Sequence, residues 1–399
     1  MRDEVIFHIN GAEHRVAGAG IMQTLSRYLR YDERATGTKI VCEEGDCGAC
    51  TVLVGRPENG QMRYRPINSC IQFLFQMDGA HVVTVEGLSK DGLTPLQESM
   101  VRCHGAQCGY CTPGFIMAMA ALYEVPRRLS AEDVRAGLTG NLCRCTGYEP
   151  IIKAALEVEK QPAVKDLYPD FAGEGAGAPL RVGNFFKPAT IEDAVEFKSA
   201  NRKCVIVQGA TDFGVWCNKR GFVPEAVLSL DGIAGLDELR VEGDEMFVGG
   251  RTTLAAIEEF VADRIPELAR ILDRFGSPQI KNAGTLAGNI ANASPIADTL
   301  PFLYVSGARL ELTGRNGVRT VPIDSFYRGY KTLDLGADEI ITRIRIPLPP
   351  RGQTLRLYKV SKRSHLDISS FTAAFLMRRT ADRIESMRIA YGGVGPVIL

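Results

Sequence analysis

The 399-residue sequence lacks an excess of charge of either sign, because 47 basic residues balance 47 acidic residues. No overall field therefore attracts nucleic acid or an anionic membrane surface, and we expect neither partner. The longest apolar stretch, Gly114 to Val125, is well short of the ~20 residues that a membrane-spanning helix needs. Met1 to Asn10 alternates charged with apolar side chains, unlike a secretory signal. We therefore expect a cytoplasmic protein.

The sequence also has no internal repeat of ~20 to 50 residues, and it is too long for a single compact core. Pro162, Pro169, Pro179 and several glycines occur without hydrophobic periodicity in residues 161–180. This composition is typical of a linker, so a domain boundary is expected there. The sequence predicts several domains.

The first 90 residues carry strand signals. Two alternating stretches, Val5 to Ile9 and Arg15 to Val16, flank an Asn10-Gly11 turn and predict a β-hairpin. Further strands are expected around Thr51 to Val54 and His81 to Val85. With a helix expected between the hairpin and these strands, they predict a small α+β unit.

The hydrophobic period becomes helical after Gly92. Thr94, Pro95 and Gln97 form a capping-box start. Similar start signals occur at Thr112-Pro113, at Ser130 and at Glu149-Pro150, which predicts four helices in all. Beyond residue 180, β-branched runs alternate with helical patterns, including helices at 191–200 and 254–262, and predict a mixed α/β region.

Eleven cysteines in a large chain without a secretory signal favour metal ligation over disulfides. Cys42, Cys47 and Cys50 have the spacing C-x4-C-x2-C, and Cys70 follows after nineteen residues. This is the plant-type spacing of a 2Fe-2S ferredoxin. A structural zinc site is the alternative, but such sites favour two separated short pairs. The quartet therefore predicts a 2Fe-2S cluster.

A second quartet consists of Cys108, Cys111, Cys143 and Cys145. Its C-x2-C and C-x-C pairs could hold zinc or iron when they are considered alone. The neighbouring first quartet favours iron. Cys111 immediately precedes an expected helix N-terminus, which stabilises thiolate charge.

Two glycine-containing segments in the α/β region could hold a phosphate. Val205 to Val207 leads into Gln208-Gly209-Ala210-Thr211-Asp212, a strand that runs into a helix N-terminus. The second segment is Gly284-Thr285-Leu286-Ala287-Gly288-Asn289. A glycine turn without a ligand remains an alternative for the first segment, and no strand precedes a G-x-G-x-x-G dinucleotide fingerprint.

Three stretches together resemble the iron-sulfur half of the molybdenum hydroxylases: Gly37 through Thr51, Gln107 to Gly114 and Asn141 to Tyr148. The order of iron-sulfur, linker and flavin regions is similar to that of the small subunit of bacterial xanthine dehydrogenases. The resemblance implies a multi-domain α+β fold with five parts. These are a β-grasp 2Fe-2S ferredoxin-like domain (1–90), a four-helix 2Fe-2S domain (91–160), a linker (161–180), an α/β FAD-binding domain of the PCMH (vanillyl-alcohol oxidase-like) type (181–350) and a truncated C-terminal α/β flavoprotein domain (351–399).

The resemblance also implies roles for individual residues. Cys42, Cys47, Cys50, Cys70, Cys108, Cys111, Cys143 and Cys145 would bind the two clusters. Gly209, Ala210, Thr211, Asp212, Phe275, Thr285, Asn289, Asp298, Ile341 and Lys359 would bind FAD, with Phe275 facing the isoalloxazine. Gln107 would approach a molybdopterin cofactor, and Tyr330 would lie where NAD enters. In the same region Ser364-His365-Leu366 replaces acidic residues common in relatives.

The activity that this resemblance implies is oxidation of hypoxanthine and xanthine to urate, with electrons passing to FAD and then NAD. The chain has no region left for molybdopterin, so no catalytic residue for substrate hydroxylation is expected in it. A large partner subunit and a hetero-oligomer are implied. Two alternatives remain: the equivalent subunit of an aldehyde or N-heterocycle hydroxylase, and a non-catalytic redox carrier or sensor.

The end of the sequence leads to a further expectation. Residues 355–399 resemble only the opening of the family's last α/β domain, with a strand at Arg388 to Ala390. A sheet cut short would leave unpaired backbone groups and an apolar face. We expect that another chain covers this edge or that the sequence continues.

Overall fold

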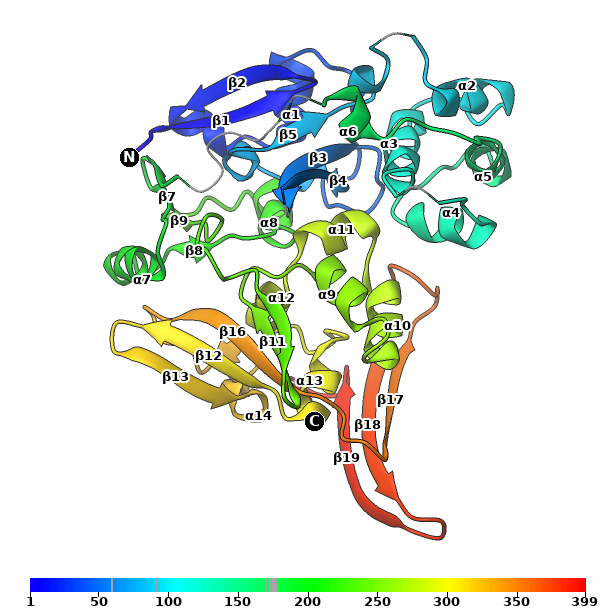
Figure 1. The fold of residues 1–399 in the computed structure, drawn as a ribbon. Helices are drawn as coiled ribbons and strands as arrows, with labels where there is room; N and C mark the ends of the chain where they lie inside the picture. The colour runs from blue at the N-terminus through cyan, green and yellow to red at the C-terminus, as the bar shows by residue number, and fades with distance from the viewer. Residues whose placement is uncertain (59, 91, 126, 170, 172–177) are drawn as a thin grey trace. The chain divides into compact units, whose positions relative to one another are not determined.

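The structure is a computed structural model of Met1 to Leu399, and it describes all residues except 59, 91, 126, 170 and 172–177. The chain divides into two compact units (Figure 1). Unit 1 comprises Met1–Phe186, Ala210–Val223 and Ser277–Asn282. Unit 2 comprises the remaining segments, Lys187–Gly209, Pro224–Gly276 and Ala283–Leu399.

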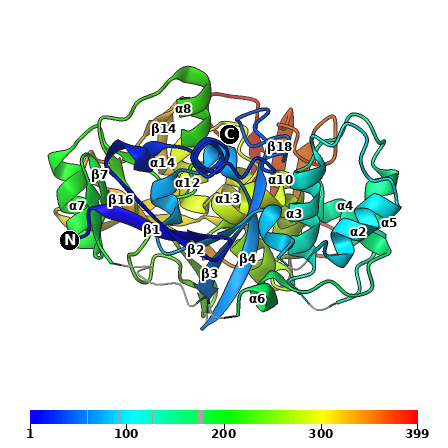
Figure 2. The ribbon, with the colours of Figure 1, turned by 90° about the horizontal axis from the view of Figure 1, so that it is seen from above.

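Unit 1 begins with a five-stranded sheet in the order β2-β1-β5-β3-β4. Figure 2 labels β1, β2, β3 and β4 of this sheet. Its strands are β1 (Glu4–Ile9), β2 (Ala12–Ala17), β3 (Thr51–Glu58), β4 (Gln61–Asn68) and β5 (His81–Val83). The β1–β2 hairpin is antiparallel, as predicted, whereas β1 and β5 are parallel. Strand β4 was not predicted, although Met62 to Arg65 alternates apolar and charged residues. The short α1 (Leu25–Arg27) continues as a π-helical turn to Asp32, which shortens the helix expected there.

The four predicted helices follow. They are α2 (Pro95–Arg102), α3 (Thr112–Leu122), α4 (Ala131–Gly137) and α5 (Glu149–Leu156). Thr94 caps α2, since its hydroxyl accepts from the Gln97 amide. Most side chains of α3 are buried, and they form one core with residues of the neighbouring helices and of β3.

The segment predicted as a linker contains a short helix, α6 (Val164–Leu167). After it, the buried Tyr168 donates from its hydroxyl to the carbonyl of Gly87 at 2.9 Å. The predicted linker is therefore anchored at Gly87 by a long-range contact that local composition does not report. Residues 172–177, with their three glycines, lie outside the described residues.

Two other helices of unit 1 come from later in the sequence. They are α8 (Phe213–Arg220) and α11 (Pro278–Ala283), the latter belonging to unit 1 as far as Asn282. Asn218 donates to the carbonyls of Glu43 and Cys70 at 3.0 and 2.8 Å. The first cysteine segment is therefore held from outside the first 186 residues.

Unit 2 contains α7 (Ile191–Ala200) and the parallel strands β8 (Val205–Ile206) and β9 (Val227–Leu228). The helix α7 and the strand β8 match the predicted helix at 191–200 and the predicted strand at 205–207. An antiparallel sheet in the order β10-β11-β16-β12-β13 follows. Its strands are β10 (Leu239–Glu242), β11 (Glu245–Gly249), β12 (Arg309–Gly314), β13 (Gly317–Pro322) and β16 (Ile340–Pro347).

Four helices contribute to the core of unit 2 together with this sheet. They are α9 (Leu254–Val261), α10 (Pro266–Phe275), α12 (Leu286–Asn292) and α13 (Leu300–Ser306). Further short elements of unit 2 are α14 (Ile323–Phe326), β14 (Tyr327–Gly329) and β15 (Thr332–Leu333), whereas β6 (Leu180–Val182) belongs to unit 1 and β7 (Phe185–Lys187) extends one residue beyond it.

The last part of unit 2 is an antiparallel sheet of β17 (Gln353–Val360), β18 (Phe371–Arg379) and β19 (Ile384–Gly392). Leu355 and Ala374 on its inner face belong to the same core as the helices. The predicted strand at 388–390 lies within β19. Among the described residues, no helix has the length and apolar character needed to cross a membrane.

Candidate iron-sulfur and flavin sites

The four thiols of the first quartet converge in the loop before β3 and the short helical turn Ser69–Ile71. The thiol of Cys42 interacts with those of Cys47 and Cys70, and the thiol of Cys50 interacts with that of Cys70. Cys50 and Cys70 are each 2% exposed. Residues 28 positions apart are thus brought to one site.

Electrostatics at this site lower the pKa of two of the four thiols, Cys42 and Cys50. Hydrogen bonds from the Cys47 and Cys70 thiols, with further bonds from the Glu44 and Cys47 amides, hold the pKa of Cys42 far below its usual value. The same competition for protons raises the pKa values of Cys47 and Cys70. A bound cation lets all four sulfurs ionise together, and backbone amides that point at sulfur are what a cluster site requires.

Glycine makes the tight wrapping of this loop possible. Gly45 and Gly48 have φ of 85° and 67°, a region that favours glycine. A Cβ on Gly48 would lie 2.2 Å from the carbonyl oxygen of Gly140, and one on Gly45 would lie 2.8 Å from the Ile71 side chain. Only glycine fits at these positions.

The second quartet converges around the N-terminus of α3. The sulfurs of Cys108 and Cys145 are 3.6 Å apart, and Cys111 interacts with Cys143. Burial and the Cys143 contact raise the pKa of Cys111 to about 12. Burial alone would raise the pKa of Cys143, but hydrogen bonds, the first from the Thr146 hydroxyl, hold it below its usual value.

The two sites differ in exposure. Cys108 and Cys145 are exposed, whereas Cys50 and Cys70 are buried. Among the described residues, no set of three or more histidine, cysteine, aspartate or glutamate side chains is arranged around a single metal ion. In the first quartet the contacts run from Cys47 through Cys42 and Cys70 to Cys50, and in the second they pair Cys108 with Cys145 and Cys111 with Cys143. Four converging thiols are what a 2Fe-2S cluster needs. The residues present therefore fit two 2Fe-2S clusters.

The two predicted phosphate segments meet in unit 2. A Cβ on Gly209 would lie 2.1 Å from the Ala283 carbonyl oxygen and 2.9 Å from the Gly284 Cα, so the two backbones are in direct contact. Thr285 caps α12 by accepting from the Gly288 amide at 3.0 Å. Asn289 accepts from the Thr299 hydroxyl at 2.6 Å. A turn that leads into a helix N-terminus, as at Thr285, can point backbone amides at a phosphate.

The other residues expected at FAD are dispersed. Asp298 and Lys359 contact each other through an ion pair, and Ile341 is buried in β16. Phe275 ends α10 and is half-buried. Three further residues, Ala210, Thr211 and Asp212, directly precede α8 and belong to unit 1.

Gln107, which is expected near the partner's molybdopterin, and Tyr330, which is expected where NAD enters, are both exposed. Gln107 lies beside the exposed Cys108. Tyr330 is 62% exposed in the turn between β14 and β15.

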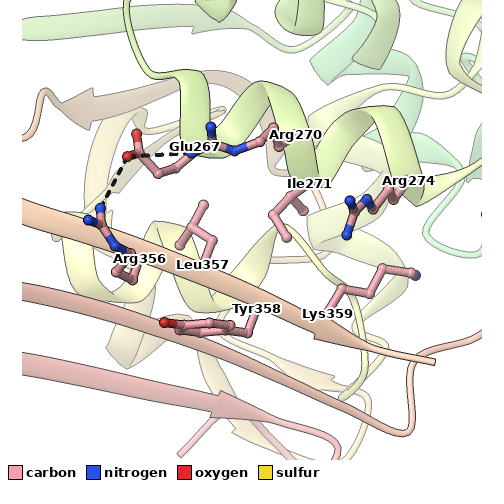
Figure 3. A pocket seen from close by; sticks show the side chains of 8 residues that line it. All are labelled: Glu267, Arg270, Ile271, Arg274, Arg356, Leu357, Tyr358 and Lys359. Carbon is pink, nitrogen blue, oxygen red and sulfur yellow. Dashed lines mark ion pairs between the residues drawn. The ribbon is translucent and has the colours of Figure 1, made fainter. Parts of the chain in front are cut away.

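One feature of unit 2 was not predicted: a cavity of about 160 Å³ between α10 and β17 (Figure 3). Arg270 and Arg356 both reach Glu267, at 3.6 and 3.5 Å. Within the described part of the chain, Arg274 forms no ion pair, and Figure 3 shows its guanidinium between α10 and β17. The sequence signal that could have indicated this cavity is the four-residue spacing of Arg270 and Arg274, which places both on one face of a helix. The other lining residues are Ile271, Leu357, Tyr358 and Lys359.

Comparison with known domain families agrees with this geometry. Residues 84–156 match a [2Fe-2S] binding domain, and residues 180–349 match the FAD binding domain in molybdopterin dehydrogenase. Residues 356–399 match the CO dehydrogenase flavoprotein C-terminal domain.

Whole-chain relatives include two xanthine dehydrogenases. Those of Drosophila pseudoobscura pseudoobscura and Emericella nidulans are each 29% identical to this chain, over 98% and 99% of its length. The matches cover 34% of each relative, so the chain spans about a third of their length.

Solved structures give the same picture. Reconstituted CO dehydrogenase from Oligotropha carboxidovorans superposes with a TM-score of 0.52 and 28% identity, over 54% of this chain and 76% of that one. Quinoline 2-oxidoreductase from Pseudomonas putida 86 shares the fold, with a TM-score of 0.51 and 23% identity over 55% and 76%. The three domain matches and the whole-chain relatives together show that the chain carries the 2Fe-2S and FAD-binding domains of the molybdenum hydroxylase family.

Proposed function

We propose that this chain is the electron-transfer subunit of a xanthine dehydrogenase, which receives electrons from a molybdopterin centre on a partner subunit. The convergence of eight cysteines into two four-thiol sets carries this proposal. The exposed Cys108 set would face the partner, with Gln107 beside the molybdopterin. The buried Cys42 set would pass electrons on to FAD.

The cofactors divide the chemistry, because a 2Fe-2S cluster carries one electron whereas flavin accepts single electrons and releases a hydride pair. The protein would bind the two clusters and the flavin at separate sites. The buried Cys50 and Cys70 would shield their side of the first cluster from water, and the backbones at Gly209 and Gly284 would approach the FAD diphosphate. Roles near FAD are proposed for Ala210, Thr211, Asp212, Phe275, Thr285, Asn289, Asp298, Ile341 and Lys359.

We propose hypoxanthine and xanthine as substrates, and the xanthine dehydrogenase relatives support this choice. The likeness to CO dehydrogenase and quinoline 2-oxidoreductase supports a hydroxylase of another substrate, such as an aldehyde or N-heterocycle, equally well. Substrate choice would belong to the partner subunit. Purine and quinoline turnover by the co-purified complex separates these alternatives.

We propose NAD as the electron acceptor, entering near Tyr330. The cationic cavity between α10 and β17 supports an acceptor that carries phosphates, because guanidinium groups bind phosphate in a bidentate way. Arg274 lies in the last turn of α10, directly before Phe275, which is proposed to face the flavin ring. The arginine is thus available for a dinucleotide phosphate.

Metal and flavin analysis of the isolated chain tests the proposal. We expect four irons and one FAD per chain, together with oxidation of NADH by an artificial dye. Stoichiometric zinc with fewer than two irons would contradict the cluster assignment. Four irons without FAD or NADH oxidation would instead favour a redox carrier or sensor.

A further inference from the structure

The two cysteine loops of unit 1 are hydrogen-bonded to each other. The amide of Leu142 donates to the carbonyl of Cys47 at 3.0 Å. Since Leu142 directly precedes Cys143, this bond joins Cys47 of one quartet to the chain neighbour of Cys143 in the other. The two cysteine sites are therefore connected through covalent bonds and this single hydrogen bond.

A second bond lies alongside the first. The Asn141 side-chain amide donates to the carbonyl of Gly48 at 3.0 Å. The Thr51 hydroxyl donates to the same carbonyl at 2.6 Å. Asn141 and Thr51 are 2% and 1% exposed, so the bonds are shielded from water.

Gln279 of α11 closes this network from a distant part of the sequence. Its side-chain nitrogen donates to the Asn141 side-chain oxygen at 2.8 Å and approaches the Thr51 hydroxyl at 3.2 Å. Gln279 is 1% exposed. One buried amide therefore holds a residue from each cysteine loop.

The backbone is closely packed around this network. A Cβ on Gly140 would lie 2.2 Å from the Gln279 side-chain oxygen. A Cβ on Gly114 would lie 2.3 Å from the Gly48 carbonyl oxygen. At the far end of α11, Asn282 donates to the carbonyl of Pro66 at 3.0 Å, so the helix is fixed at both ends.

We propose that Gln279 is a positioning residue that locks the two cysteine loops in register and so fixes the connection between the clusters. The inference rests on the proposed function, because it assumes that both quartets bind clusters. Ser277–Asn282 belongs to unit 1, whereas the residues on both sides of it, including Phe275, belong to unit 2. In the sequence, Phe275, the proposed flavin contact, is therefore followed closely by the segment that holds the two cysteine loops.

The test compares Gln279→Met with Gln161→Met in the full, iron-loaded chain. Gln161 is a matched control, since it is also buried and accepts from the Leu96 amide, but it contacts neither cysteine loop. Deuterium exchange is measured in the peptide 138–146, which contains the Leu142 amide. We expect exchange about tenfold faster in Gln279→Met and unchanged in the control, because a buried hydrogen bond is lost. Electron transfer between the clusters, followed by rapid-freeze EPR, should slow in the same variant.

Unchanged exchange and transfer in a Gln279→Met protein with four irons would overturn the proposal. If that variant loses iron, Thr51→Val replaces it, because it removes only a hydroxyl from the network, and the same two outcomes apply. If both variants lose iron while Gln161→Met retains it, the proposal is also overturned. The network would then be required for the clusters to bind, and not for the relative position of the loops. Absence of iron from the unmodified chain would instead contradict the proposed function.

Discussion

The ammonium of Lys359 lies 2.5 Å from the carboxylate of Asp298, and the two side chains are only 3% and 5% exposed. The Ser369 hydroxyl donates to the other oxygen of Asp298 at 2.5 Å. The ammonium also donates to the Asp367 carbonyl at 3.0 Å. Asp298 therefore ties the segment after α12 to the C-terminal sheet, and Lys359 is its buried counterion.

Replacement of Lys359 by methionine should lower the free energy of unfolding by about 3–5 kcal/mol, because the Asp298 carboxylate would remain buried without its cation. Denaturant unfolding measures this loss. Lys203→Met is the control, since the Lys203–Glu225 pair is exposed and such pairs contribute less than about 1 kcal/mol. Equal losses in the two variants would show that burial of the Lys359 pair does not matter.

A second stability prediction concerns Glu124, which accepts from the Val164 amide at the start of α6. Burial raises the pKa of the Glu124 carboxyl to about 7. The folded state then holds a proton that the unfolded state releases between about pH 4.5 and 7, so stability falls as pH rises through this range. Between pH 6 and 8 the free energy of unfolding should fall by about 1 kcal/mol.

Glu124→Gln should remove this part of the pH dependence, because the amide does not titrate. Denaturant unfolding of both proteins at pH 6 and pH 8 makes the comparison. A decline of the same size in Glu124→Gln would assign the pH dependence to another group.

Local sequence signals predicted much of this fold. The Asn10-Gly11 turn, the Thr94 cap and the strand before Gln208 each act within a few residues, and the structure has the hairpin, α2 and β8 at these places. Strand β4 was missed, because its pattern gains meaning only from pairing with β3.

Contacts between distant residues were beyond sequence reasoning. Both quartets were recognisable from spacing alone, but the network that joins them depends on Gln279, which lies 138 residues from Asn141. Nothing around Gln279 distinguishes it from an ordinary helical glutamine. Likewise, Asp298 and Lys359 were assigned separately to the flavin site by resemblance, and their mutual ion pair was not predicted.

The cavity of Figure 3 gives a prediction about the acceptor. Arg274→Glu should raise the KM for NAD by about tenfold or more with little change in kcat, because a charge-assisted contact to phosphate is replaced by repulsion. Arg135→Glu, at an exposed position on α4, reverses the same charge and serves as control. An unchanged KM in Arg274→Glu would exclude the cavity as a phosphate site.

The last prediction tests the order of the carriers. Cys143 is 8% exposed and interacts with Cys111, so Cys143→Ser should disable the second cluster while leaving the buried first quartet intact. Electrons from the partner's molybdopterin would then be stopped, and purine-to-NAD activity should be lost. NADH-to-dye activity should remain, since it would enter at the flavin.

Two measurements keep this test specific. EPR should show the loss of one of two cluster signals, which separates a local defect from unfolding. Cys204→Ser is the control, because Cys204 is a buried thiol outside both quartets, and it should retain both activities. Equal loss of purine and NADH-to-dye activity in folded Cys143→Ser protein would contradict the proposed order, because electrons that enter at the flavin would then also depend on the exposed cluster.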